Sequence, residues 1–287
     1  MKLLVEVSEK DNLYLDKSDG IILPLEGYAV ESTCFFTLEE IEDIVSQSKN
    51  FVFVKLNKNF MNEDIEGLKK VLVKLNELKV DGIFFYDLAV LQLKKELGLD
   101  INLVWNQTHM VNNYKTCDYY YSKGVKYALL GKEITLEEIT EIIKKSKITS
   151  MVEVVSRPSV AFSKRKLVTN YNHDIGKKKG NTLQVIEKVT GGKYDLYENN
   201  DGTSFFLDTI TNGTSIIKDL YDCGCEFIIM REYGLEDYFE ELIIDTKDYI
   251  LNGCLEKDYV NKYKKIGDST NFFFRKTIYV VKKKWKR

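Results

Sequence analysis

Short apolar runs alternate with amphipathic segments along most of the chain. Eight runs are rich in β-branched or aromatic residues, as buried parallel strands are. These runs span residues 2–7, 20–25, 51–56, 82–86, 101–105, 127–130, 151–155 and 227–230. Between them, apolar residues recur at three- and four-residue steps, which is the spacing of an amphipathic helix. In the segment 62–79 these residues are Ile65, Leu68, Leu72, Leu75 and Leu78.

Two threonines mark helix starts within this alternation. Thr37 and Thr135 each begin the sequence TLEE. This is a capping box, in which the threonine hydroxyl accepts from the third helical N–H and the glutamate reaches back to the cap. Two units of strand, loop and capped helix therefore indicate a repeated βα architecture.

Eight strands with intervening helices predict an α/β fold of the (β/α)8, TIM-barrel-like type. The alternative is an open doubly wound sheet. The gap between the seventh and eighth runs is much longer than the others and predicts an insertion at about residues 156–212, within a single barrel domain of residues 1–270. Residues 193–207 of this insertion predict a β-hairpin, with Asn200, Asp201 and Gly202 as its turn signal. Because loops after the strand C-termini form the active face of a barrel, the insertion is the first candidate for function.

Composition favours a soluble cytoplasmic protein. Hydrophobic residues make up 44% of the 287 residues, which excludes a disordered chain. The N-terminal apolar stretch is broken by Glu6, and no run approaches the roughly 18 apolar residues of a membrane helix. The odd number of cysteines argues against a disulfide framework and for a reducing compartment. They are Cys34, Cys117, Cys223, Cys225 and Cys254.

Charge is nearly balanced overall but unevenly distributed. The chain has 42 Lys and Arg residues against 44 Asp and Glu. Residues 157–179, however, hold seven basic residues against one acidic residue, and the C-terminal residues 275–287, within a basic tail at 271–287, hold seven basic residues and no acidic one. Aromatic residues such as Phe162, Tyr171 and Trp285 lie among them. Basic segments with interleaved aromatic residues are typical of nucleic-acid binding, although solvated ends and loops are the plainer explanation.

Common cofactor and metal motifs are absent from the sequence. There are two histidines, His109 and His173, and no HExxH or CxxC motif. Cys223 and Cys225 are separated by one residue, which matches no common zinc site. No Walker loop, dinucleotide-binding GxGxxG motif or GxSxG elbow is found. We therefore predict no metal site.

Several segments in a fixed order resemble peptidase family U32. EVVSRPSVAFSKRKLVTNY at residues 153–171 resembles the signature region of that family. FFYDLAVLQLKKELGLDINLVWNQTHMVNN at residues 84–113 is similar to another block, with Asp87 on the motif aspartate. GVKYALLGKEITLEEI at residues 124–139 is similar to a third, with Lys132 at the motif arginine and Glu133 at the motif glutamate. The family's arginine after the second strand is Glu31 here.

The segment KYDLYENNDGTSFFLD at residues 193–208 resembles a short, cysteine-poor branch of the family. That branch is implicated in forming 5-hydroxyuridine at the tRNA wobble position. The resemblance implies a barrel-like fold, tRNA as a partner and a longer paralogue as the second partner. Cluster-bearing members place cysteines at the positions of Ser159 and Lys166. Since an iron–sulfur cluster needs about four thiolates, we expect no cluster and no other cofactor.

Three functions follow from the resemblance. The leading one is an RNA-modification factor that holds tRNA as a clusterless subunit while a longer paralogue performs the hydroxylation. The alternatives are a collagenase-like peptidase, which the absence of a recognisable triad or zinc motif disfavours, and a binding module without chemistry. Whether the chain is an enzyme on its own stays open.

Candidate site residues fall into two groups. The catalytic candidates are Asp87, Lys132, Glu133 and Arg165. The candidates for substrate or RNA binding are His109, Ser163, Lys164, Lys166, Asn170, Tyr171, Lys177, Lys178 and Lys179.

Structural explanations stand beside these roles. Asp87 could instead cap a helix that starts near Leu88, and Lys132 and Glu133 could form a salt bridge at the barrel rim. Arg165 is the best anion ligand because its planar fork matches phosphate and carboxylate, or it braces the insertion through a carboxylate.

Overall fold

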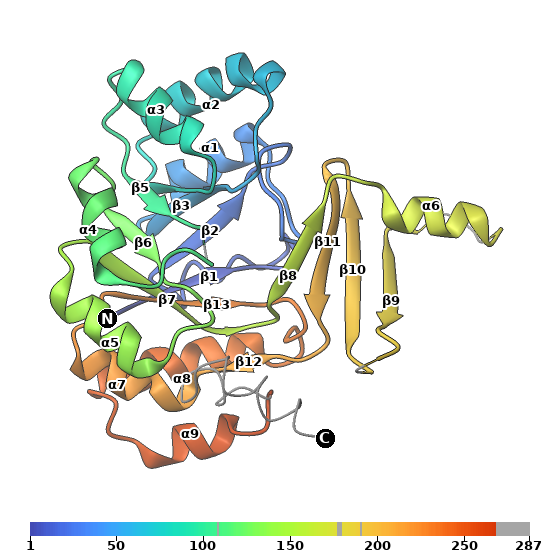
Figure 1. Cartoon of the computed structure of the whole chain (residues 1–287). Helices are drawn as coiled ribbons and strands as arrows, with labels where there is room; N and C mark the ends of the chain where they lie inside the picture. Colours follow the sequence, from blue (N-terminus) through green and yellow to red (C-terminus); the bar gives the residue numbers. More distant parts are fainter. Residues whose placement is uncertain (108, 177–179, 190, 268–287) are drawn as a thin grey trace.

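The computed structural model describes residues 1–107, 109–176, 180–189 and 191–267. Eight parallel strands close into a barrel in the order β1-β2-β3-β4-β5-β6-β7-β13, because β7 pairs with β6 and β13 pairs with β1 (Figure 1). They are β1 (Lys2–Glu6), β2 (Gly20–Pro24), β3 (Phe51–Leu56), β4 (Gly82–Phe85), β5 (Leu103–Trp105), β6 (Tyr127–Leu129), β7 (Thr149–Ser156) and β13 (Phe227–Arg231). Closure confirms the predicted TIM-barrel-like fold and excludes the open sheet.

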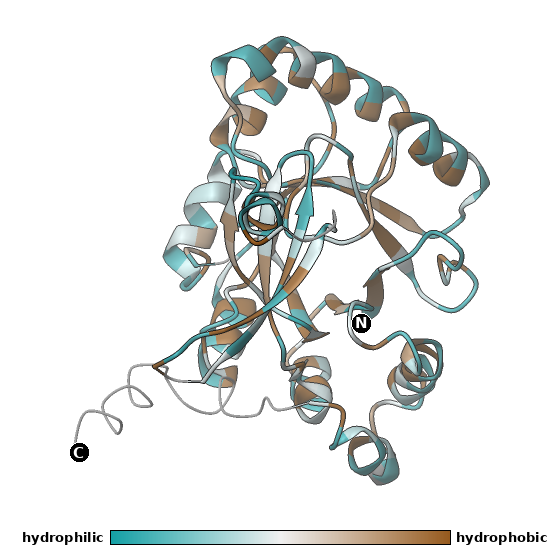
Figure 2. Ribbon diagram, turned by 90° about the vertical axis from the view of Figure 1, so that its right-hand side faces the viewer, coloured by the Kyte–Doolittle hydropathy of each residue, from teal (hydrophilic) through white to brown (hydrophobic). Residues whose placement is uncertain are grey.

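Helices pack around the outside of this barrel, with apolar residues facing the strands (Figure 2). They are α1 (Leu38–Gln47), α2 (Ile65–Glu77), α3 (Leu88–Glu96), α4 (Tyr114–Ser122), α5 (Leu136–Lys145), α7 (Ile217–Asp222), α8 (Phe239–Leu251) and α9 (Lys257–Tyr263). Thr37 and Thr135 form the predicted capping boxes at the starts of α1 and α5. No described helix is long and apolar enough to cross a membrane.

Apolar side chains fill the interior of the barrel. Because side chains alternate across a strand, every second residue of each strand faces inward. The rings of Phe53 and Phe227 meet edge to face with centroids 6.0 Å apart, and Tyr127 packs against both. The inner cluster consists of Leu4, Ile22, Phe53, Phe84, Val104, Tyr127, Leu129, Met151, Phe227 and Ile229. The N-terminal half of the barrel is therefore a packed core and leaves its C-terminal end for a site.

The predicted insertion is present after β7. It forms a second, antiparallel sheet in the order β8-β11-β10-β9, which stands beside the barrel with α6 beyond it (Figure 1). Its elements are β8 (Ser159–Ser163), α6 (Leu167–Asp174), β9 (Thr182–Ile186), β10 (Lys193–Asn199) and β11 (Gly202–Leu207). β10 and β11 are the predicted hairpin, and β12 (Thr211–Asn212) then returns to pair with β7. The predicted basic tail lies outside the described residues.

Candidate active site at the barrel mouth

A cavity of about 570 Å³ opens at the C-terminal ends of the barrel strands. Strand β8 of the insertion contributes one wall, through Ser159, Val160 and Phe162. The opposite walls come from loops that follow the barrel strands, including Asn57 and Asn106. Its volume falls within the range of small-molecule sites, and its position is the face of a barrel where active sites form.

A charged layer lies inside the barrel at the C-terminal ends of its strands, and Glu153 of this layer lines the cavity. Each of four strands places an ionised side chain two residues beyond an apolar one, so both face inward. The charged residues are Glu6 on β1, Lys55 on β3, Glu153 on β7 and Arg231 on β13. All four side chains are at most 14% exposed. Buried charges persist only when they are paired and hydrogen-bonded.

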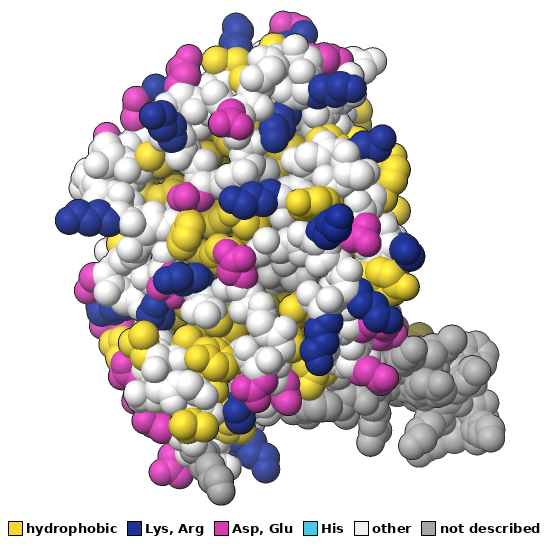
Figure 3. Space-filling model, turned by 90° about the vertical axis from the view of Figure 1, so that its left-hand side faces the viewer, with side chains coloured by type: hydrophobic (Ala, Val, Ile, Leu, Met, Phe, Trp, Pro, Cys, Tyr) yellow, Lys and Arg dark blue, Asp and Glu magenta, His cyan; other side chains and the backbone are white. Residues whose placement is uncertain are grey.

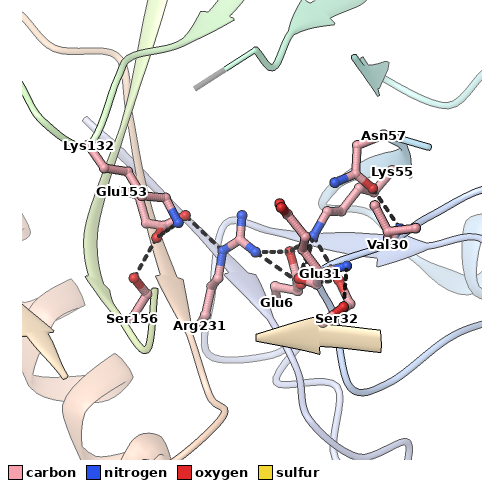
Figure 4. Close-up of polar contacts among 11 residues, drawn as sticks. Glu6, Val30, Glu31, Ser32, Lys55, Asn57, Lys132, Glu153, Ser156 and Arg231 are labelled. Carbon is pink, nitrogen blue, oxygen red and sulfur yellow. Dashed lines mark hydrogen bonds and ion pairs between the residues drawn. The ribbon is translucent and has the colours of Figure 1, made fainter. Parts of the chain in front are cut away.

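These four residues form one connected network with Lys132 from the loop after β6 (Figure 4). Arg231 links the two carboxylates: Nε lies 2.8 Å from Glu153 Oε2, and Nη1 lies 3.3 Å from Glu6 Oε1. Lys55 Nζ lies 3.3 Å from the same Glu6 oxygen. Lys132 Nζ lies 2.7 Å from Glu153 Oε1 and is the member with the greatest exposure, at 26%.

Hydroxyl groups complete the pairing at both ends. Ser32 donates to Glu6 Oε1 at 2.7 Å and accepts from Lys55 Nζ at 2.7 Å. Ser156 donates to Glu153. The network joins three cations and two carboxylates, and its charged members that line the cavity are Lys132 and Glu153.

Burial and neighbouring charges shift the titration of this network. Burial alone would raise the pKa of Glu153, but Arg231 and Lys132 lower that pKa to about 2. Burial lowers the pKa of Lys55 to about 8, although Glu6 opposes the change. Glu153 is therefore a permanent carboxylate at neutral pH. It holds cations in place and is unsuited to act as a general acid.

Glu31 lies at the rim with a left-handed backbone. Its φ of 59° is uncommon for a residue other than glycine. Its carbonyl oxygen accepts from Lys55 Nζ at 3.1 Å, and its N–H donates to Ser204 Oγ at 3.2 Å. The strained turn therefore joins the charged layer to strand β11 of the insertion.

Four of the sequence-predicted residues line the cavity, namely His109, Lys132, Glu133 and Lys164. Lys132 pairs with Glu153 and not with Glu133, so the predicted ion pair has a different partner. Lys164 Nζ donates to the carbonyl oxygen of Asn59 at 3.3 Å, across the mouth of the cavity.

Asp87 does not line the cavity. Its Oδ1 accepts from Ala89 N at 2.9 Å at the start of α3, and its Oδ2 accepts from Phe60 N at 3.0 Å. The capping interpretation of Asp87 is therefore confirmed, and the carboxylate also fixes the loop after β3.

The other candidate residues of the insertion do not line the cavity. Arg165 is exposed at the turn between β8 and α6, and Asn170 and Tyr171 are exposed on α6. Lys166 donates to the carbonyl oxygen of Asn199. Ser163 Oγ accepts from the N–H of Arg165 at 3.2 Å, a local turn contact. Lys177, Lys178 and Lys179 lie outside the described residues.

Sequence analysis missed most of the charged layer. Glu6, Lys55 and Glu153 each interrupt an apolar strand run, and that interruption was the available signal. Arg231 follows the predicted last strand directly. Asn57 and Asn106 gave no comparable signal, because a polar residue after a strand is ordinary.

The described residues do not fit an iron–sulfur cluster. Cys34, Cys117, Cys225 and Cys254 are buried in the core. Burial raises the thiol pKa of each. Within the described ranges, no group of three or more His, Cys, Asp or Glu side chains could hold a metal ion. At the positions of the family's cysteines, Ser159 and Lys166 offer a hydroxyl and an ammonium, which are not cluster ligands.

The fold and this cavity define a TIM-barrel protein with a ligand-sized site at its mouth, lined by both polar and apolar side chains. The model of peptidase family U32 matches residues 30–230, and the chain belongs to this family, as its motifs predicted. It is 27% identical over 252 residues to tRNA hydroxylation protein P2 of Bacillus subtilis, covering 79% of this chain and 81% of that protein.

Two further relatives match smaller shares of their own length. The chain is 22% identical to tRNA hydroxylation protein P1 of Bacillus subtilis, covering 66% of this chain and 45% of P1. It is 29% identical to an uncharacterized protease of Methanocaldococcus jannaschii, covering 75% of this chain and 53% of that protein.

Proposed function

We propose that this chain takes part in tRNA hydroxylation and serves the formation of 5-hydroxyuridine at the wobble position. The observation that carries the proposal is the similarity to tRNA hydroxylation protein P2, which extends over 79% of this chain and 81% of that protein. Such coverage includes both the barrel and the insertion, the two parts that enclose the cavity.

Basic side chains at the mouth support an RNA substrate. Lys132 and Lys164 line the cavity and offer two cations to phosphate. Arg165 is exposed nearby at the end of β8, so we assign it to phosphate contact and not to chemistry. On the face that carries the helices opposite the insertion, by contrast, Lys and Arg are interspersed with Asp and Glu (Figure 3). Among the described residues, that face therefore offers no continuous basic patch for a polyanion.

We further propose that the chain acts without an iron–sulfur cluster, beside a longer U32 paralogue. The replacement of the family's cysteines by Ser159 and Lys166 supports the first part. The second part is supported by the two Bacillus subtilis relatives, one of similar length and one of which this chain spans only 45%. A peptidase mechanism finds no support at Ser163, whose hydroxyl accepts from the backbone of Arg165.

Deletion of the gene tests the proposal directly. Digested tRNA from the deletion strain should lose 5-hydroxyuridine and its derivatives, as measured by mass spectrometry, and the intact gene should restore them. Affinity purification from the native cell should recover the longer paralogue. Unchanged wobble hydroxylation in the deletion strain contradicts the function, whereas recovery of the chain alone contradicts only the partnership.

A further inference from the structure

We infer that the mouth cavity receives a single pyrimidine base, and that Asn57 selects uracil over cytosine at the 4-position of the ring. The inference rests on the proposed function, because it takes the base from a tRNA substrate. It goes beyond that function by assigning the base to a defined site and its recognition to two buried side chains. An enzyme that acts on a base commonly draws it out of the stack into such a pocket.

Asn57 is a donor of fixed orientation. It follows β3, lines the cavity and is 6% exposed. Its Oδ1 accepts from the backbone N–H of Val30 at 2.9 Å, which settles which end of the amide is oxygen. The amide nitrogen is turned away from Val30 (Figure 4). Asn57 therefore holds its oxygen against Val30 and turns its N–H donors elsewhere, so these donors complement a carbonyl oxygen and not an amino group.

Asn106 supplies a second amide. It follows β5, lines the same cavity and is 5% exposed. Its backbone N–H donates to Phe85 O at 2.9 Å, whereas no hydrogen bond joins its carboxamide to another described residue. Its carboxamide at the cavity wall is therefore available to bond a ligand or water. A carboxamide pairs with the N3–H and a neighbouring carbonyl of uracil by one donor and one acceptor.

Aromatic side chains line the space between these amides and solvent. Tyr86 and His109 both line the cavity, with ring centroids 6.1 Å apart, and Phe162 lines it from β8. Bases stack on such rings. The cavity, at about 570 Å³, has room for a base and part of its ribose.

The shape of a nucleotide fixes which ring position meets the buried amide. The ribose is attached at N1, and C4 lies across the ring from it. A base that enters from the mouth therefore presents its 4-position to the buried side chains that line the cavity, and we assign this position to Asn57. Uracil has a carbonyl oxygen there and cytosine an amino group, so the fixed donor of Asn57 distinguishes them. The adjacent C5 then lies in the enclosed part of the cavity.

Binding of anticodon stem–loop RNAs to the full chain tests this inference. Three RNAs differ only at the wobble position, which carries uridine, cytidine or an abasic ribose. The wild-type protein should bind the uridine form at least about tenfold more tightly than the other two. Asn57→Asp replaces the donor by an acceptor while an oxygen still accepts from Val30. It should abolish or reverse the preference for uridine over cytidine.

Controls separate this result from misfolding and from failure of the proposed function. Asn106→Ala should weaken binding of the two base-bearing RNAs but keep the preference for uridine, because Asn57 is intact. Asn252→Asp makes the same chemical change at the exposed C-cap of α8, where it removes only a surface hydrogen bond to Glu256, and should bind the three RNAs as wild type does. Equal wild-type affinity for the three RNAs overturns the inference even if the deletion strain has lost hydroxylation. If the proposed function is wrong, hydroxylation is unchanged in that strain. If Asn57→Asp fails to fold, the affinities of the wild-type protein for the three RNAs still test the inference.

Discussion

Arg231 Nε and Glu153 Oε2 lie 2.8 Å apart inside the barrel, on neighbouring strands β13 and β7. The same arginine reaches Glu6, and the same glutamate reaches Lys132. Removing one partner of a buried pair leaves an uncompensated charge, which costs more than the pair contributes.

Glu153→Gln should therefore destabilise the fold by about 3–5 kcal/mol. The amide keeps the shape of the side chain but leaves Arg231 and Lys132 without their carboxylate. Urea unfolding followed by circular dichroism measures the change in the free energy of unfolding. Glu133→Gln, at the rim of the same cavity, is the matched control and should change stability by less than about 0.5 kcal/mol. Equal effects of the two variants would show that the network does not support the barrel.

The acid stability of the protein should depend on the carboxyl group of Glu153. Its pKa is lowered to about 2 in the folded state, against about 4.3 in an unfolded chain. A depressed carboxyl pKa contributes stability that is fully present above the unfolded pKa and is lost as the pH falls through the folded pKa. Unfolding free energy should therefore fall between about pH 5 and pH 2. The difference between wild type and Glu153→Gln should shrink over this window, and a constant difference would contradict the assignment.

Two substitutions of Asp87 distinguish a capping role from a catalytic one. Asp87→Ala removes the acceptor for Ala89 N and Phe60 N and should cost about 1–2 kcal/mol of stability. Asp87→Asn retains an equally good cap but no carboxylate. We expect Asp87→Asn to keep both its melting temperature and wobble hydroxylation in cells. If this variant loses hydroxylation but not stability, Asp87 has a catalytic role.

The barrel could be predicted from the sequence because its strands are short, mostly apolar runs rich in β-branched and aromatic residues, and these runs alternate with amphipathic segments. The hairpin of β10 and β11 could be predicted because its turn residues are local. The charged layer could not, since Glu6 and Lys55 gain partners only when β1, β2 and β3 come together in register.

The insertion shows a further limit of sequence reasoning. Its basic residues predicted a shared site for Arg165 and Lys164, yet only Lys164 lines the cavity. Strand β8 turns at this point into α6, so neighbouring residues face different surroundings. Charge runs identify a segment, but the direction of each side chain depends on the pairing of β8 with β11.

The protein should contain little iron when it is purified anaerobically. Four of its cysteines are buried in separate parts of the core, and Ser159 stands where cluster-bearing relatives have a cysteine. Iron and acid-labile sulfide assays should give values far below one cluster per chain. A cluster-bearing U32 protein purified in parallel is the positive control. Stoichiometric iron and sulfide would overturn the proposal that this chain acts without a cluster.

The two basic residues at the end of β8 should contribute to tRNA binding in different ways. Lys164→Ala and Arg165→Ala each remove one charge, so each should reduce the slope of log affinity against log salt by about 1. Arg165→Lys keeps the charge but removes the planar fork that grips phosphate at two points. It should weaken binding while leaving the slope unchanged. Lys70→Ala, on the exposed side of α2, is the control and should leave both quantities unchanged. Filter binding of tRNA at several salt concentrations measures both. Slopes unaltered in both alanine variants would place the RNA elsewhere on the molecule.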